Sequence, residues 1–222
     1  MKGLLARAAR TGAMRIPLLL GAAAVAGLYS PPARRWYLTW GAGAEEVTAV
    51  LPGDELLPVP DIVSTRAVTV DALPASVWPW LVQMGSGRAG AYTYDWIENL
   101  FGLGMHSADA ILPEFQHLEV GDVLPLGPDG PGMRVEIYEP ESTLVFRSED
   151  ENWVWIFTLR QVVGGTRLVS RNRIATPDAN WAGRALDRLV LEPGSLVMER
   201  RMLLGIKERA ERHIRHGQPQ PA

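Results

Sequence analysis

The sequence contains no cysteine, and this absence removes several kinds of chemistry at once. A chain without thiols forms no disulfides and holds no thiolate zinc site or cysteine nucleophile. Histidine is also scarce, with four residues in the whole chain. Glu114 and His117 form an E-x-x-H pair, but the sequence offers no second ligand set of the kind that such pairs need on facing helices. We therefore expect no metal and no other cofactor.

An excess of charge of either sign is missing as well. The net charge is −3 and the isoelectric point is about 5.8, which gives no reason to expect nucleic acid as a partner. Hydrophobic residues make up 47% of the chain, within the range of folded globular proteins. The 222 residues suffice for one sizeable domain and an extension.

The N-terminal region has no acidic residue before Glu45, and an uncharged run extends from Ile16 to Tyr29. At ~1.5 Å per residue this run reaches about 21 Å as a helix, less than the ~30 Å hydrocarbon core of a bilayer. A signal peptide, a short signal anchor and a docked helix remain open. We favour an apolar helix over residues 1–30 that anchors the protein to a membrane, with the side of the domain undetermined. The basic residues before the run are Lys2, Arg7, Arg10 and Arg15.

Prolines mark the next boundary, because Pro31 and Pro32 are expected to end the first helix. Residues 31–62 include the proline-rich stretch LPGDELLPVPD and predict an extended linker arm. The main domain is expected over residues 63–214, followed by a disordered tail at 215–222.

The main domain opens with an alternating strand at 65–70, in which Arg66 shares a face with Val68 and Val70. Two short helices are expected next, over 77–84 and 92–100. The apolar stripe of the second is Trp96, Leu100 and Phe101.

Short strands separated by turn residues fill the middle of the domain, a pattern typical of antiparallel hairpins. The chain is expected to end in helices over 179–191 and 195–214, the longer one capped by Gly194 and Ser195. The five strands are expected at 120–126, 133–138, 143–148, 153–160 and 166–174.

Three stretches resemble the START-like superfamily, also called SRPBCC or polyketide cyclase/dehydrase-like, and in particular a bacterial, mainly actinobacterial group. They are TRAVTVDALPASVWPWLVQMG, AYTYDWIENL and VMERRMLLGIKERAE, and the resemblance covers about Val63 to Ile214. It implies an α+β helix-grip fold, in which a curved antiparallel sheet wraps around a long C-terminal helix. It also implies an apolar cavity for a hydrophobic small molecule or lipid, and it supplies no catalytic residues.

Two strands are expected to form the wall of that cavity. Trp153, Trp155 and Phe157 share one face of their strand. Ser170 and Asn172 face inward if the neighbouring arginines face solvent; the reverse places arginines in the pocket and favours an anionic ligand. Met198 and Met202 offer adaptable apolar surface. We predict as ligand-binding residues Trp80, Met84, Tyr94, Asp95, Trp155, Phe157, Ser170, Asn172, Met198 and Met202.

The loop from Gly85 to Gly90 matches G-x-G-x-x-G, but it follows a helix rather than a strand, so we expect a flexible loop at the cavity mouth instead of a nucleotide site. Asp95 and Glu98 lie three apart and either act as general acid and base or have a structural role, in which they cap the helix or pair with arginines of the sheet; we favour the structural role. The sequence favours binding of a hydrophobic small molecule or lipid. A cyclase- or dehydratase-like enzyme and a scaffold without a ligand remain alternatives.

Overall fold

The computed structural model describes residues 27, 29–127 and 132–215, and the side chains of 213–215 lie outside it. The chain divides into two compact units, Met1–Tyr37 and Leu38–Ala222. In the first, helix α2 (Pro31–Leu38) begins at the two prolines that the sequence suggested as a helix end. Proline suits the first turn of a helix, where its missing N–H needs no partner.

The expected N-terminal helix falls almost wholly outside the described residues. Among those that are described, no helix is long and apolar enough to cross a bilayer.

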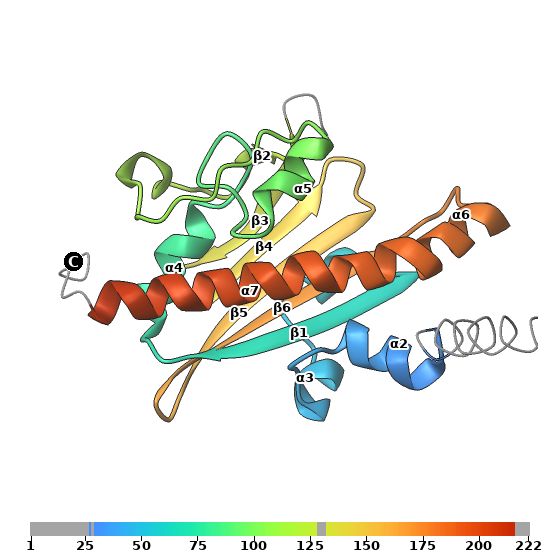
Figure 1. The fold of residues 1–222 in the computed structure, drawn as a ribbon, viewed down its shortest axis with the longest axis horizontal. Helices are drawn as coiled ribbons and strands as arrows, with labels where there is room; N and C mark the ends of the chain where they lie inside the picture. The colour runs from blue at the N-terminus through green and yellow to red at the C-terminus, as the bar shows by residue number, and fades with distance from the viewer. Residues whose placement is uncertain (1–26, 28, 128–131, 216–222) are drawn as a thin grey trace, which may run out of the picture. The chain divides into compact units, whose positions relative to one another are not determined.

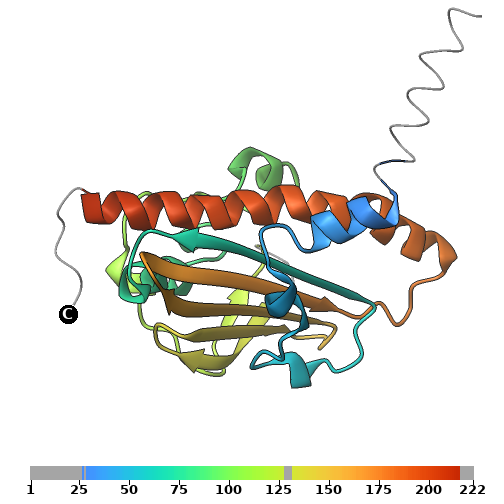
Figure 2. The ribbon, with the colours of Figure 1, turned by 90° about the horizontal axis from the view of Figure 1, so that it is seen from below.

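The second unit is built on a six-stranded antiparallel sheet in the order β1-β6-β5-β4-β3-β2. Helix α7 (Glu192–Arg215) runs across one face of this sheet, as Figures 1 and 2 show from two sides. This is the helix-grip arrangement, so the α+β fold prediction is confirmed. The strands are β1 (Ile62–Val70), β2 (Val123–Pro125), β3 (Gly132–Glu139), β4 (Thr143–Ser148), β5 (Trp153–Val162) and β6 (Gly165–Ile174).

The long C-terminal helix is continuous with the shorter helical stretch before it. Helix α6 (Trp181–Leu186), a π-helical turn η3 (Asp187–Leu191) and α7 follow one another without a break. The predicted cap at Gly194 and Ser195 is therefore wrong, because both residues lie inside α7. The Ser195 hydroxyl donates instead to the Glu192 carbonyl oxygen, at 2.8 Å.

Two helices lie between β1 and β2. Helix α4 (Pro74–Val82) is largely buried and continues past Pro79. Helix α5 (Asp95–Leu100) begins later than expected because Tyr92 has a left-handed backbone (φ 58°) that a right-handed helix does not accommodate. The expected stripe of Trp96, Leu100 and Phe101 is exposed, at 66%, 75% and 77% of each residue's surface. The buried residue of α5 is Glu98. Short 3₁₀ turns complete this part of the chain, η1 (Asp54–Leu56) before β1 and η2 (Pro113–Phe115) before β2.

The apolar core lies between the sheet and the two helices α4 and α7. Met202, Leu203 and Ile206 on α7 are fully buried in the same cluster as Trp80 of α4 and Phe157 of β5. Full burial of one such side chain contributes ~1.5–3 kcal/mol. This cluster therefore fixes α7 against the inner face of the sheet.

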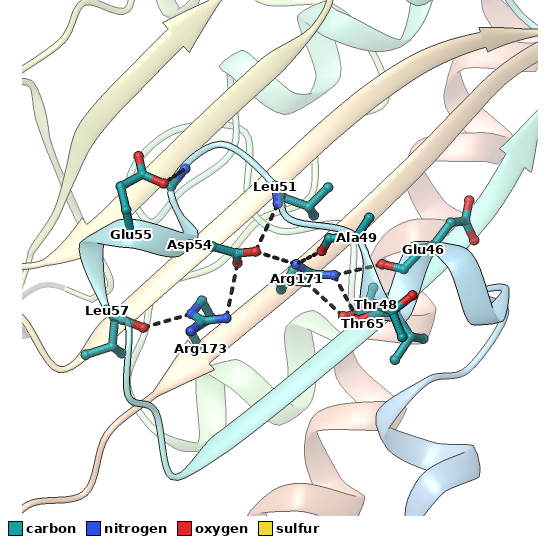
Figure 3. A network of polar contacts seen from close by, with 12 residues as sticks. Glu46, Thr48, Ala49, Leu51, Asp54, Glu55, Leu57, Thr65, Arg171 and Arg173 are labelled. Carbon is teal, nitrogen blue, oxygen red and sulfur yellow. Dashed lines mark hydrogen bonds and ion pairs between the residues drawn. The ribbon is translucent and has the colours of Figure 1, made fainter.

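The outer face of the sheet is covered by residues 44–58, which were expected to belong to an extended arm. This segment contains the short helix α3 (Ala44–Thr48) and η1. Arg171, for which the sequence left solvent or the pocket as alternatives, is buried beneath it and donates to the Glu46 and Ala49 carbonyl oxygens, at 2.7 and 2.8 Å (Figure 3). The last carbonyls of a helix have no partner within the helix, and here the guanidinium supplies one.

Asp54 links this segment to two strand arginines. Its carboxylate lies 2.6 Å from Arg171 and 3.3 Å from Arg173, and it also accepts the Leu51 N–H (Figure 3). Around it, Leu51, Leu56 and Leu57 pack on a small apolar cluster of the outer sheet face, made of Val145, Val154 and Ile156. The segment is thus a covering layer of the sheet.

Replacing Asp54 with alanine should lower the free energy of unfolding by about 3 kcal/mol, because it leaves the buried Arg171 guanidinium without its carboxylate. Urea denaturation measures this difference. Glu55→Ala is the matched control, since the exposed Glu55 bonds only the nearby Gly53 N–H and its loss should cost less than about 1 kcal/mol. Equal losses for the two variants would show that Asp54 does not hold the segment.

Candidate functional site

One pocket opens between the C-terminal end of α4 and strands β2 to β5. Its volume is about 60 Å³ and it is partly open to solvent. Ser86 is the polar member of its lining, and the Ser86 hydroxyl is occupied by a 2.7 Å bond to the Leu103 carbonyl oxygen. The pocket surface is therefore almost entirely apolar. Its lining residues are Met84, Gly85, Ser86, Ala91, Met105, Leu124, Pro125, Leu126, Met133, Phe146 and Trp155.

The G-x-G-x-x-G loop forms one rim of this pocket. Gly85 and Gly90 exchange backbone hydrogen bonds of 3.0 and 3.1 Å, which closes the loop into a small hairpin. Arg88 then donates to the Met84 and Val82 carbonyl oxygens at the end of α4. The loop lies at the pocket, as expected, but its backbone and its arginine are both engaged in structural bonds. Nothing in this geometry resembles a phosphate cradle.

Tyr92 follows the lining residue Ala91 and holds this part of the chain in place. Its buried phenol donates to the Trp80 carbonyl oxygen and accepts from Gln83, both at 3.0 Å. Burial raises the pKa of Tyr92 far above its ordinary value. The Arg209 guanidinium stacks on the tyrosine ring, 4.9 Å from its centre, so α7 also holds this part of the chain in place.

A buried polar network lies beside the pocket, between α7 and the inner face of the sheet. At its centre the Glu199 carboxylate of α7 pairs with Arg66 of β1. The same carboxylate accepts hydrogen bonds from the Ser170 hydroxyl at 2.6 Å and the Asn172 amide at 3.1 Å. Ser170 and Asn172 thus face inward, and the arginines of β6 face the opposite side. The interpretation with arginines in the pocket is wrong.

Two tryptophans extend this network along β5. The Trp155 indole N–H donates to the Ser170 hydroxyl at 2.9 Å, and the Trp153 indole N–H donates to the Asn172 amide oxygen at 2.8 Å. The two indole rings stack with centres 5.6 Å apart. Trp155 also lines the pocket, so it belongs to both the apolar surface and the polar network.

Glu199 illustrates the balance of forces in this interior. Burial raises the pKa of its carboxyl, while the charge of Arg66 and the hydrogen bonds from Ser170 and Asn172 act in the opposite direction. A buried charge is tolerated only when it is paired and hydrogen-bonded, and here each partner is present. The network is therefore stable as a whole and sensitive to the loss of one member.

The ten predicted site residues divide into three groups. Met84 and Trp155 line the pocket, and Ser170 and Asn172 belong to the network. The others lie elsewhere: Trp80, Phe157 and Met202 are buried in the core, Met198 is half-buried on α7, Tyr94 precedes α5, and Asp95 is bonded to Ser107.

The sequence reasoning missed Glu199 and the inward direction of Arg66, although both carried a signal. Glu199 falls on the apolar stripe of α7, three residues after Leu196 and four before Leu203. Arg66 shares a strand face with Val68 and Val70. A positive and a negative charge on two faces expected to be buried predict an ion pair between them. The lining residues from β2 to β4 carried no comparable signal.

The two carboxylates of α5 differ in their surroundings. Asp95 accepts the Ser107 N–H at 2.8 Å and the Ser107 hydroxyl at 2.5 Å. Glu98 is buried, and its Oε2 atom has no hydrogen-bond partner among the described residues. Burial raises the pKa of Glu98 and the Asp95 charge raises it further, against the effect of the Thr93 hydroxyl. Among the described residues neither carboxylate forms an ion pair with a sheet arginine, so that alternative receives no support, and neither carboxylate lines the pocket.

Glu199→Gln should lower the free energy of unfolding by about 3 kcal/mol, because it removes the negative charge that is paired with the buried Arg66 guanidinium. The double variant Arg66→Met/Glu199→Gln should recover most of this loss, since the glutamine oxygen still accepts from Ser170 and Asn172. Urea denaturation provides the comparison. The exposed pair Arg201 and Glu208 on the same helix is the control, and Glu208→Gln should change stability by less than about 1 kcal/mol. A double variant no more stable than Glu199→Gln would contradict this account.

Glu98→Gln should stabilise the protein near neutral pH, because the glutamine side chain has no charge to bury. A raised pKa in the folded state contributes stability below the unfolded value of ~4.3 and loses it as the pH rises through the folded value. Glutamine is neutral throughout, so the two proteins should converge in stability near pH 4. Thermal unfolding across pH measures the difference, with the exposed Glu119→Gln as control. A gap that does not close on acidification would refute the assignment.

Comparison with solved structures finds chains to which this one is similar over about two thirds of its length or more. The polyketide cyclase-like protein Cgl2372 of Corynebacterium glutamicum is 14% identical, over 70% of this chain and 95% of that one, with a TM-score of 0.44. The protein MLL2253 of Mesorhizobium loti is 16% identical, over 71% and 100%, with a TM-score of 0.41. Protein BH1534 of Bacillus halodurans is 21% identical, over 67% and 97%, with a TM-score of 0.40. No family model and no curated protein matches the chain. At these identities and TM-scores, the similarities say nothing of a ligand or an activity of this chain.

Proposed function

We propose that this protein binds the apolar end of a small hydrophobic molecule in the pocket beside Trp155. The observation that carries the proposal is the lining itself, which is apolar and open on one side. Sites that enclose a whole drug-sized molecule measure ~300–1,000 Å³. At about 60 Å³, this pocket receives one end of a molecule while the remainder lies outside.

The chemistry of the lining selects hydrocarbon. Among the described residues, no charged side chain lines the pocket. The Trp155 indole N–H is bonded to Ser170, and the Ser86 hydroxyl is bonded to Leu103. A polar group that entered would lose its water and find no partner, at a cost of ~1–3 kcal/mol. Burial of apolar surface, at ~25 cal/mol per Å², then provides the affinity.

The two alternative functions receive less support from this geometry. Glu98 has a buried carboxylate whose Oε2 atom finds no hydrogen-bond partner in the described part of the chain, as acid/base catalysis would use, but it does not line the pocket in which a substrate would sit. A scaffold without a ligand is consistent with a small pocket, and it differs from the binding proposal in one measurable way. Only a binding protein shows saturable occupancy beside Trp155.

The test is a titration of the full chain, labelled with nitrogen-15 at tryptophan, with the linear alcohols from butan-1-ol to decan-1-ol. The Trp155 indole resonance, assigned with Trp155→Phe, should shift and saturate. Each added methylene should tighten binding about fourfold until the chain fills the pocket. Absence of a saturable shift with every alcohol would exclude the proposal and favour the scaffold.

A filled pocket should abolish this binding. Ala91→Phe places a large side chain into the lining and should weaken alcohol binding about tenfold or more, equivalent to ~1.4 kcal/mol. Ala182→Phe makes the same substitution at an exposed position on α6 that does not line the pocket, and it should leave affinity unchanged. Equal effects of the two variants would place the binding site elsewhere.

A further inference from the structure

We infer that Ser170 and Glu199 are positioning residues that set the depth of the pocket, because they hold the Trp155 indole in place as its inner wall. This inference rests on the proposed function for its ligand, and on the network geometry for its mechanism. Trp155 contributes the β5 part of the lining, and its N–H bond to Ser170 is 2.9 Å long. The orientation of this ring therefore shapes the side of the pocket that adjoins the polar network.

The indole contact runs diagonally across the sheet. Trp155 lies opposite Asn172 in the β5–β6 register, yet its ring bonds Ser170, two residues earlier in β6. Trp153 lies opposite Ile174 and bonds Asn172 by the same offset. Large side chains reach such diagonal neighbours readily. Both rings lean in the same direction, and each is held by one polar residue of β6.

The direction of the hydrogen bonds depends on Glu199. A serine hydroxyl has one proton to donate and lone pairs that accept. Ser170 donates that proton in a 2.6 Å hydrogen bond to the Glu199 carboxylate, which leaves a lone pair of the hydroxyl to accept from the indole N–H. An ionised carboxylate only accepts, so the hydroxyl is not free to reverse. Glu199 is itself held by Arg66, and α7 thereby fixes a side chain in the pocket wall.

Contacts with neighbouring aromatic rings further restrict the orientation of the Trp155 indole. Trp155 lies between Trp153, at 5.6 Å, and Phe157, at 4.8 Å between ring centres. Without the Ser170 hydroxyl the indole N–H would be left unpaired, and a half-buried indole is favoured to turn until its N–H meets water. That rotation, with the space left by the hydroxyl, lengthens the pocket toward α7.

The experiment compares Ser170→Ala with Asn172→Ala in the full chain, using the same alcohol series. Ser170→Ala should move the end of the affinity rise to a longer alcohol, with binding of the longest alcohols tightened about fourfold per additional buried methylene. Asn172→Ala also removes a hydrogen bond to the Glu199 carboxylate. The indole that Asn172 holds is that of Trp153, however, which does not line the pocket. This variant should leave the preferred length unchanged.

A second pair of variants tests Glu199 with Arg66 replaced in both, so that the removal of the carboxylate does not break the buried ion pair from one side only. Arg66→Met/Glu199→Gln keeps an oxygen that accepts the Ser170 proton, so the preferred alcohol length should remain that of the wild type. Arg66→Met/Glu199→Leu removes the acceptor and should behave as Ser170→Ala does. A purely structural role would change the stability of both double variants without separating their preferred lengths.

Hydrogen exchange of the indole N–H provides a readout without ligand. Trp155 should be protected in the wild type and lose protection in Ser170→Ala but not in Asn172→Ala. Equal shifts in preferred length for both single variants, or none for Ser170→Ala, would overturn the inference. A wild type that binds no alcohol would instead overturn the proposed function. In that case retained protection of Trp155 in Ser170→Ala would show that the serine does not position the indole.

Discussion

The two-residue alternation of β6 is the constraint on which the rest of the structure depends. Ser170 and Asn172 point toward α7, while Arg171 and Arg173 point toward the segment on the outer face. A shift of one residue in the pairing of this strand would exchange the two sets and place arginines against the apolar interior. Both faces of the strand carry polar side chains with dedicated partners, so the register of the whole sheet is specified from two sides.

The inner partner is an ion pair, which is a costly way to hold a helix. Removing Arg66 and Glu199 from water costs free energy that apolar packing of the same volume would avoid. The compensation is directional: the carboxylate has fixed donors on β1 and β6, so α7 has one favoured position along the sheet. The apolar stripe alone, which runs through Leu203 and Ile206, would tolerate small slides of the helix.

Much of the fold could be predicted from the sequence, because its signals are local. Strand β4 occupies Thr143–Ser148 as expected, and β6 differs from its expected range by one residue, since polar turns, with two glycines before β6, and alternation define them. What could not be predicted depends on partners far away in the chain. Asp54 meets Arg171, and Arg66 meets Glu199, across separations of more than 100 residues. The pocket was expected between the sheet and α7, where the polar network now fills the space. Trp96 belongs to an expected apolar stripe but is exposed. An apolar stripe in the sequence does not show whether another part of the chain covers it.

The pairing of β1 with β6 has a consequence for the chain while it is being synthesised. Ile62 pairs with Ile174, so the first strand to leave the ribosome finds its neighbour only after about 100 further residues have been made. At ~5–20 residues per second, this interval lasts about 5–20 seconds. During that time β1 is an unpaired strand that carries Arg66 without Glu199, and unpaired strands invite association with other chains. The buried arginine, a liability in the finished core, is at this stage a charge on an exposed strand, and strand charges of this kind discourage aggregation.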